Sequence, residues 1–159
     1  MAFREVARVK NRITEGECID ILRVEKRGVL SVIGDDGYPY GMPLNHFYND
    51  DDGCLYFHSG KKGHRTDSFM RCDKASYCVY DSGVKEEGDW ALIIRSVIVF
   101  GRIEIIEDRD EIYDIARKLS LKFTDDLEYI EKEIERSGPA TLMFRLRPEH
   151  ITGKRVKEA

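Results

Sequence analysis

The sequence has no long hydrophobic run. Its longest apolar stretch, residues 91–100, is interrupted by Arg95, whereas crossing a bilayer takes roughly 20 consecutive apolar residues. The basic residues near the N-terminus are not followed by the apolar segment of a secretory signal. We therefore expect a cytoplasmic protein without a membrane partner.

Several marks of specific chemistry are also missing. The four cysteines form no Cys-x-x-Cys pair and have no histidine at metal-ligand spacing, so we predict buried thiols and no metal site. The Gly-x-Ser-x-Gly, Walker A and Gly-x-Gly-x-x-Gly motifs do not occur. The net charge of -4 comes from charges of both signs, without the basic profile of a general nucleic-acid binder.

The length of 159 residues predicts one domain over 1–159. Thr14 and Glu17 form a capping-box pair at the start of a helix, for which Gly28 is a plausible end. A second helix is predicted over 64–71, with Phe69 and Met70 turned inward. Later apolar spacing changes to the helical period, over about 112–119 and 127–134.

Strand signals dominate the remaining chain. We predict strands at 29–33, 38–48, 54–59, 74–81, 91–106 and 140–147, the first two joined by the Gly-Asp-Asp-Gly turn at 34–37. Pro39 and Pro43 place the second strand at an edge, Gly101 suggests a bulge, and Pro148 is expected to end the last strand. The pattern predicts a mainly β fold, a closed or nearly closed antiparallel barrel with peripheral helices.

A basic loop between a strand and a helix is the most informative segment. Around the start of the helix at 64–71 stand Ser59, Lys61, Lys62, His64 and Arg65. The free N–H groups and partial positive charge of a helix N-terminus suit a phosphate. A solvated basic loop explains the same residues, and spacing alone leaves that alternative open.

Arg95 and Ser96 interrupt an otherwise apolar strand. A buried charge is costly unless it is paired, so Arg95 either reaches solvent or meets an anion or an electron-rich ring. An outward-facing arginine on an alternating strand remains the simpler alternative.

Several separated motifs occur together in order. They are GDDGYPY at 34–40, LYFHS at 55–59, KGHR at 62–65, RSVI at 95–98, FGR at 100–102 and ITGK at 151–154. Over nearly its whole length the chain thereby resembles the FMN-binding family related to pyridoxamine 5′-phosphate oxidase. Within that family it most resembles the nitroimidazole-resistance (Nim-type) reductases.

The resemblance implies a split β-barrel and a homodimer with FMN in two clefts at its interface. By position, Lys62, His64 and Arg65 would bind the FMN phosphate with support from Ser59. His58 would lie near the flavin ring as the one candidate catalytic group. The other expected cofactor contacts are the backbone around Met42, Pro43, Leu44 and Asn45, and Arg95 and Ser96 from the neighbouring strand. The tail at 151–154 would help to close the interface.

Two positions depart from the family pattern. Arg65 stands where the phosphate motif often has lysine, which keeps the charge and adds a fork for bidentate contact. The tail at 147–159 lacks the tryptophan and the basic cluster with which the vitamin B6 oxidases hold their substrate. We therefore do not expect pyridoxamine phosphate to be the substrate.

The expected activity is an FMN-dependent reduction of a small acceptor such as a nitroaromatic (nitroimidazole-like) molecule, with NADH or NADPH as a possible donor. The alternatives are a flavin-binding carrier or sensor without turnover, and a haem-binding relative with His58 or His64 as ligand. For testing the phosphate assignment, Lys122 is expected on an outer helix and offers a control position.

Overall fold

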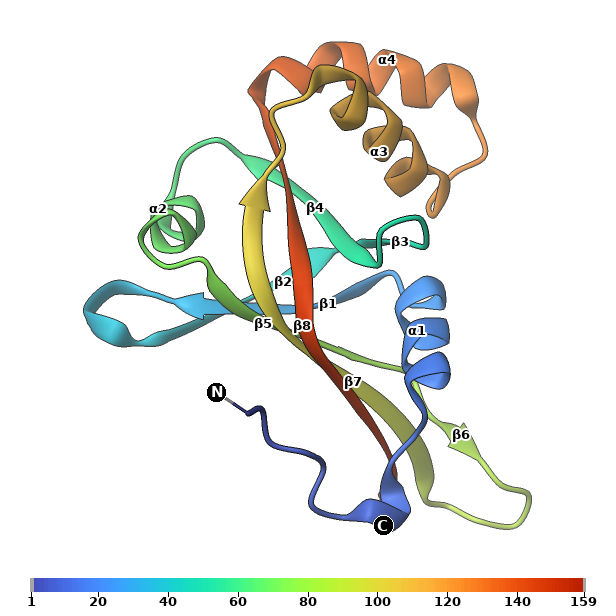
Figure 1. Cartoon of the computed structure of the whole chain (residues 1–159). Helices are drawn as coiled ribbons and strands as arrows, with labels where there is room; N and C mark the ends of the chain where they lie inside the picture. Colours follow the sequence, from blue (N-terminus) through green and yellow to red (C-terminus); the bar gives the residue numbers. More distant parts are fainter. Residues whose placement is uncertain (1, 159) are drawn as a thin grey trace.

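The computed structural model describes residues 2–158 (Figure 1). The strands are β1 (Arg27–Ile33), β2 (Pro39–Asn45), β3 (Phe47–Asn49), β4 (Cys54–Gly60), β5 (Lys74–Tyr80), β6 (Val84–Lys85), β7 (Leu92–Ile105) and β8 (Thr141–Glu158). The helices are α1 (Glu15–Val24), α2 (His64–Arg71), α3 (Arg109–Leu121) and α4 (Leu127–Ser137), with short 3-10 turns at Val9–Asn11, Asp35–Gly37 and Gly138–Ala140.

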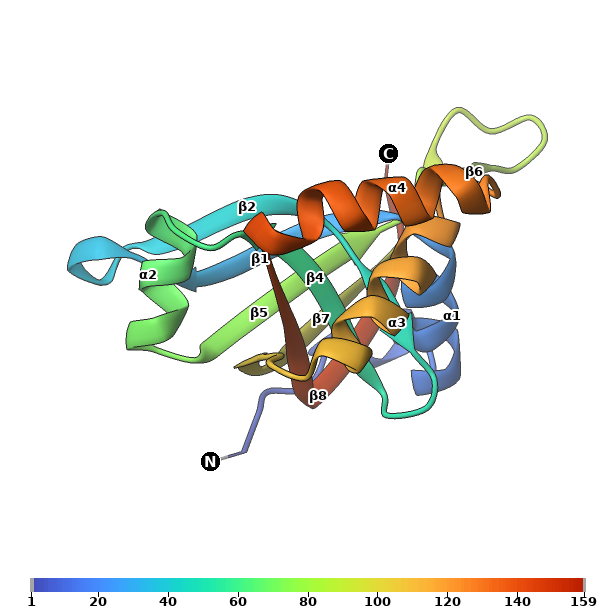
Figure 2. The same ribbon diagram turned by 90° about the horizontal axis from the view of Figure 1, so that it is seen from above.

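One antiparallel sheet organises the molecule. Its strands follow the order β2-β1-β5-β7-β8-β4-β3, and β6 pairs with β7 off this path. The sheet curls into a half-barrel, so the mainly β fold with peripheral helices is confirmed. Helices α3 and α4 lie together over one end of the sheet, as Figure 2 shows.

The core fills the concave side of this sheet. Phe57 of β4 stacks on Phe144 of β8 at a centroid distance of 5.3 Å and meets the edge of Tyr77 of β5 at 4.9 Å. All three side chains are fully buried. A smaller cluster under α3, including Tyr56, Ile115 and Met143, lies on the other side of β4. Burial of apolar surface on both faces of β4 fixes the strand between barrel and helices.

Local signals in the sequence place several elements correctly. Thr14 and Glu17 form both bonds of the capping box. The turn between β1 and β2 puts Asp36 at φ 55° and Gly37 at φ 78°, the left-handed region that these residue types tolerate. The register shift of β7 lies between Phe100 and Gly101, at the predicted bulge.

Three strand boundaries differ from the prediction. The expected strand at 38–48 is divided into β2 and β3, because His46 turns its ring into the core between them. Gly28 does not end α1 but lies within β1, where a Cβ atom would stand 2.5 Å from the carbonyl oxygen of Cys78. Pro148 does not end β8; it faces Gly101 at the bulge, where the regular ladder is already interrupted.

Two side chains also differ from expectation. Met70 is 65% exposed, so only Phe69 of the predicted inward pair is buried. Lys122 is not a free surface residue, because its Nζ donates hydrogen bonds to the carbonyl oxygens of Glu25 at 2.7 Å and His46 at 2.8 Å. These bonds tie the end of α3 to the barrel, which makes Lys122 unsuitable as a neutral control.

None of the helices within residues 2–158 combines the length and the apolar character required to cross a membrane.

Candidate functional site

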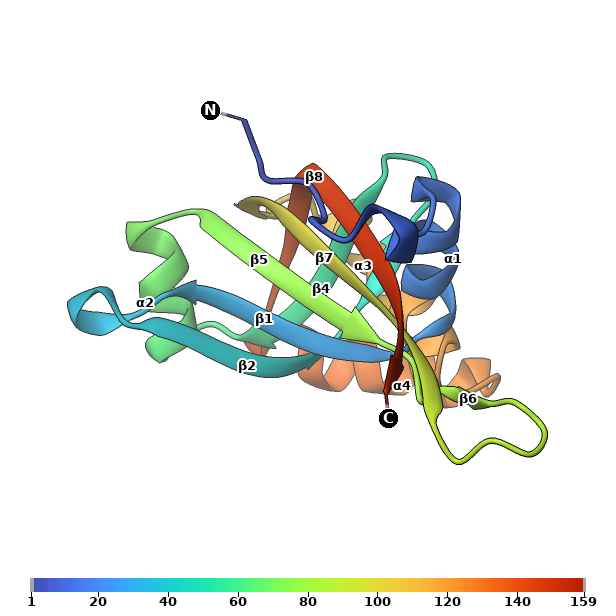
Figure 3. The same cartoon turned by 90° about the horizontal axis from the view of Figure 1, so that it is seen from below.

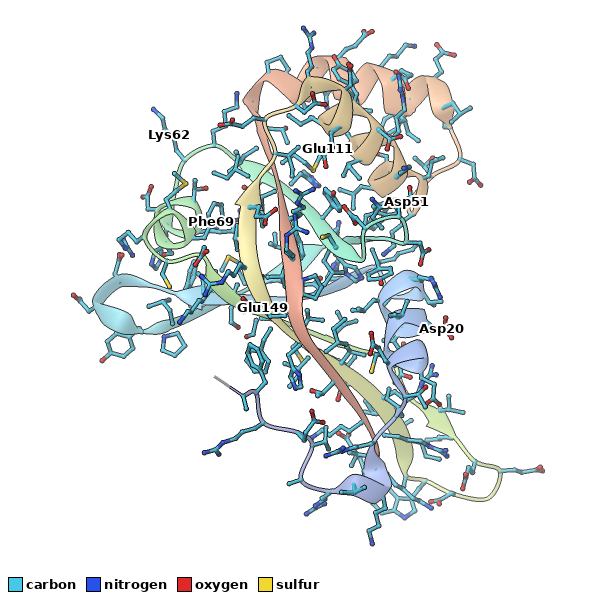
Figure 4. All side chains as sticks on the ribbon, in the orientation of Figure 1. Asp20, Asp51, Lys62, Phe69, Glu111 and Glu149 are labelled. Carbon is cyan, nitrogen blue, oxygen red and sulfur yellow. The ribbon has the colours of Figure 1, made fainter. Side chains whose placement is uncertain are left out.

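The connection between β4 and α2 carries the predicted phosphate-binding residues. The helix begins at His64, and its N-cap, Gly63, adopts φ 128° and ψ 173° and offers no side chain to the first-turn N–H groups. Lys61 and Lys62 are exposed, and Figure 4 shows Lys62 extending outward from this connection. The helix N-terminus is therefore uncapped by side chains and flanked by cations, which favours an anion.

Arg65 contributes the least satisfied polar group of this region. The side chain is half-buried, and its Nε atom is buried without a hydrogen-bond partner among the described residues. Buried N–H groups in folded proteins nearly always have an acceptor. The residues present therefore fit an anionic group that would supply this acceptor.

His64 is held by the hairpin of β1 and β2. Its ring stacks on Tyr40 with centroids 4.1 Å apart, and its Nε2 lies 3.6 Å from the carboxylate of Asp35. Arg71, at the other end of α2, donates to the same carboxylate at 2.7 Å. Asp35 thus anchors both ends of the helix, a role that its position in a turn did not reveal.

His58 and Ser59 lie on opposite faces of β4, as strand geometry requires. The Ser59 side chain is buried, and its hydroxyl donates to the carbonyl oxygen of Gly60 at 3.0 Å. His58 lines a cavity of about 720 Å³ beneath α3 and α4. The His58 side chain is exposed, but partial desolvation there, together with the charge of Arg65, lowers the pKa of its imidazole and favours the neutral ring.

The β2 segment from Met42 to Asn45 occupies an edge of the sheet, as the two prolines predicted. Met42 is buried in the core, whereas Pro43 is exposed opposite Val29. The Leu44 carbonyl accepts a hydrogen bond from Tyr77 at 2.9 Å, and the Asn45 side chain accepts one from Arg27 at 3.0 Å.

Arg95 has an internal partner that the sequence did not reveal. Its Nε donates to the carboxylate of Asp81 at 2.8 Å, and its backbone N–H donates to the same group at 3.0 Å. Burial alone would raise the pKa of Asp81, but these hydrogen bonds lower it below its ordinary value. The guanidinium remains 44% exposed, so its outer N–H groups are still accessible.

Within one chain the predicted residues form three groups, one of which is Met42 to Asn45 on the edge strand β2. Ile105 of β7 pairs with Phe144 of β8, which pairs with Phe57 of β4, so Ile105 marks the level of His58. At about 3.3 Å per residue, the part of β7 from Ser96 to Ile105 is roughly 30 Å long. The structure brings His58, Lys62, His64 and Arg65 to one end and leaves Arg95 and Ser96 far along the sheet.

A family comparison agrees with this architecture. The model of the family described as pyridoxamine 5′-phosphate oxidase matches residues 14–155. The chain belongs to this family.

Solved structures share the split-barrel fold of this pyridoxamine 5′-phosphate oxidase family member. A conserved hypothetical protein from Mycobacterium tuberculosis superposes with a TM-score of 0.79 at 16% identity, covering 96% of this chain and 90% of that one. A candidate 5-nitroimidazole antibiotic resistance protein from Bacteroides thetaiotaomicron superposes with a TM-score of 0.75 at 19% identity, covering 92% of this chain and 87% of that one.

A FAD-binding protein from Mesorhizobium loti gives a TM-score of 0.64 at 23% identity, covering 91% of this chain and 96% of that one. A comparison with curated proteins by sequence gives no match. At these identities the structural likeness establishes the fold of this family member.

Proposed function

We propose that this protein is an FMN-binding oxidoreductase that reduces small oxidised acceptors, nitroaromatic molecules among them. The observation that carries the proposal is the buried, unpartnered Nε of Arg65 beside an uncapped helix N-terminus. A phosphomonoester bears about -1.5 to -2 charges at neutral pH and has three strong acceptor oxygens. Lys62, Arg65 and the first-turn N–H groups of α2 supply matching donors.

The names of two structural relatives support the same cofactor class and reaction. One relative is described as FAD-binding and another as a candidate nitroimidazole resistance protein. A bound flavin supplies hydride and electron transfer, while the protein supplies position and electrostatics. His58 contributes a neutral imidazole beside the phosphate-binding residues, and its N–H can donate to an oxygen atom of an acceptor.

Two copies of the chain would complete the cofactor site. The outer face of β1, β5 and β7, seen in Figure 3, exposes five large apolar side chains: Val29, Ile33, Tyr80, Ile98 and Phe100. Adjacent exposed apolar side chains of this kind mark interaction surfaces. Because Arg95 and Ser96 lie far from His58 in one chain, a homodimer through this face is our proposal for supplying them from the partner copy.

Pyridoxamine phosphate is not the proposed substrate, because residues 147–159 contain no tryptophan. The proposed donor is NADH or NADPH.

The proposal is tested with the full-length purified protein. We expect a yellow dimer from which FMN is extracted and identified by mass, and which oxidises NADH or NADPH when a nitroaromatic acceptor is added. A colourless dimer that does not take up FMN would refute the assignment. FMN binding without turnover across donors and acceptors would indicate a carrier or sensor, and a sharp Soret band would indicate haem.

A further inference from the structure

The cavity beneath α3 and α4 has the dimensions of a small-molecule site. Its volume of about 720 Å³ lies within the range of ligand pockets, about 300–1,000 Å³. Residues of α3 and α4 line the cavity together with Thr141 and Met143 at the start of β8 and His58 near the end of β4. Figure 2 shows these two helices over the end of the sheet. Most of its lining is apolar, with Ile112, Ala116, Phe123, Tyr129, Ile134 and Met143 contributing.

Aromatic side chains from three places surround this space. Tyr113 comes from α3, Phe123 from the turn after it and Tyr129 from α4. Phe123 is 42% exposed and Tyr129 55% exposed, so part of each ring is accessible. Rings of this kind pack favourably against a flat ring, with a preference for offset or edge-to-face contacts.

Among the basic and acidic side chains that line the cavity, His58, Arg109 and Glu135 have no hydrogen bond or ion pair within residues 2–158. Among residues 2–158, the His58 ring makes no hydrogen bond, and Arg109 forms no ion pair and lies 5.8 Å from the centre of the Tyr113 ring. The acidic Glu133 is different, because Arg136 holds its carboxylate at 2.8 Å. The three side chains without such a partner are exposed, so the N–H groups of His58 and Arg109 are accessible and able to donate to an electron-rich oxygen of a ligand, whereas the Glu135 carboxylate can only accept.

We propose that this cavity binds a planar aromatic molecule carrying an electron-rich oxygen substituent, such as a nitro group, with the oxygen near His58 and Arg109. This proposal rests on the proposed function in one respect: the bound molecule would be the electron acceptor, since His58 borders both the cavity and the phosphate-binding residues. The binding itself requires no electron transfer. It is measurable on the oxidised protein.

The test fills the cavity without touching the phosphate site. Ala116→Trp places an indole in the cavity, while Lys132→Trp places the same group on the exposed side of α4. Calorimetric titration of the oxidised full-length protein with nitrobenzene and 4-nitrobenzoate should give one site per chain. We expect Ala116→Trp to weaken binding by at least about tenfold and Lys132→Trp to change it by less than about twofold.

A second variant keeps the test decisive if Ala116→Trp does not fold. Arg109→Gln removes the cation and leaves the volume nearly unchanged. This variant should weaken the binding of 4-nitrobenzoate by about tenfold and that of neutral nitrobenzene by about threefold or less. Cyclohexanecarboxylate, which has the charge without the flat ring, should bind more weakly than benzoate to the unmodified protein.

The outcomes separate this inference from the proposed function. If Ala116→Trp retains FMN and binds the probes normally, the cavity assignment is wrong while the flavin assignment stands. If the protein does not bind FMN but binds the probes, and Ala116→Trp weakens that binding, the cavity assignment stands while the flavin assignment is wrong. If the unmodified protein binds no probe and Ala116→Trp converts a dimer into monomers, the cavity is a protein interface and the inference is overturned.

Discussion

Arg65 and Arg145 differ in what surrounds their guanidinium groups. Arg145 of β8 donates to Glu104 at 2.8 Å, and to both Glu111 and the hydroxyl of Tyr56 at 3.1 Å. Figure 4 shows Glu111 of α3 beside this part of β8. Arg65 has a buried Nε with no partner among residues 2–158. Arg145 thus has hydrogen-bond partners from its own chain, whereas the buried Nε–H group of Arg65 lacks an acceptor.

The difference separates stability from binding. A charge whose partners all come from its own chain holds elements together, and removing it leaves those partners unpaired. A charge without internal partners contributes little to holding the fold and keeps its donors for a ligand. We therefore expect substitution of Arg145 to lower stability without changing FMN affinity, and substitution of Arg65 to lower FMN affinity without changing stability.

The largest effect is expected for Arg145→Ala. Glu104, whose pKa is lowered to about 2 by Arg147 and Arg145, loses one cation, and Glu111 and Tyr56 lose the same partner. The free energy of unfolding, measured by urea titration, should fall by about 3 kcal/mol. FMN affinity of the folded fraction should be unchanged; a loss of stability below about 1 kcal/mol would show that the network adds little.

Acid pH should reduce the contribution to stability of another side chain whose partners all come from its own chain, His46. Its ring is fully buried, with Nε2 donating to the Leu22 carbonyl at 2.7 Å and Nδ1 2.8 Å from the Tyr77 hydroxyl. Burial and the charge of Lys122 lower its pKa from 6.5 to about 3. Because the unfolded chain binds the proton first, stability is complete above pH 6.5 and declines as pH falls toward about 3.

The decline should reach about 2 kcal/mol between pH 6.5 and about pH 5, as measured by urea titration at each pH. His46→Gln should be less stable at neutral pH and should lose this part of the pH dependence. Equal slopes for the two proteins in that pH range would contradict the assignment to His46.

Arg65→Ala tests the predicted phosphate-binding residues. The dissociation constant for FMN should rise about tenfold, which corresponds to about 1.4 kcal/mol, while the free energy of unfolding without FMN should hardly change. Arg136→Ala is the matched control, because Arg136 is 75% exposed and, within residues 2–158, pairs only with a neighbour on its own helix. Equal FMN retention in both variants would contradict the assignment of Arg65 to the FMN phosphate.

Lys62→Ala should have the smallest effect. Lys62 is exposed, so its attraction for a phosphate is screened by water and salt. We expect FMN affinity to fall about threefold at low salt and by less at high salt, with Lys132→Ala as the control. A larger effect than that of Arg65→Ala would reverse our ranking of the two cations.

Local chemistry made much of this fold predictable. The capping box at Thr14, the turn at Asp36 and Gly37 and the limits of α2 all follow from interactions among residues close in sequence. The failures depend on distant partners. Gly28 is explained by the approach of Cys78, and Pro148 by the bulge at Gly101 across the sheet.

The candidate site divides in the same way. The basic residues at 61–65 could be predicted as an anion site because they are contiguous and precede a helix. Asp81 could not be predicted as the partner of Arg95, nor Arg109 and His58 as residues that line one cavity, because only the folded chain brings them together. The position of Lys122 between two carbonyls has the same cause.

The central place of β8 has a consequence for biosynthesis. This strand follows every other strand of the sheet in the chain, yet it joins β7 on one side to β4 on the other. Until the ribosome has released it, β3 and β4 have no partner in the rest of the sheet and leave a backbone edge open to other chains. A nascent chain that stalls after α4 should therefore need chaperone protection, and its rescue should depend on completion of this last strand.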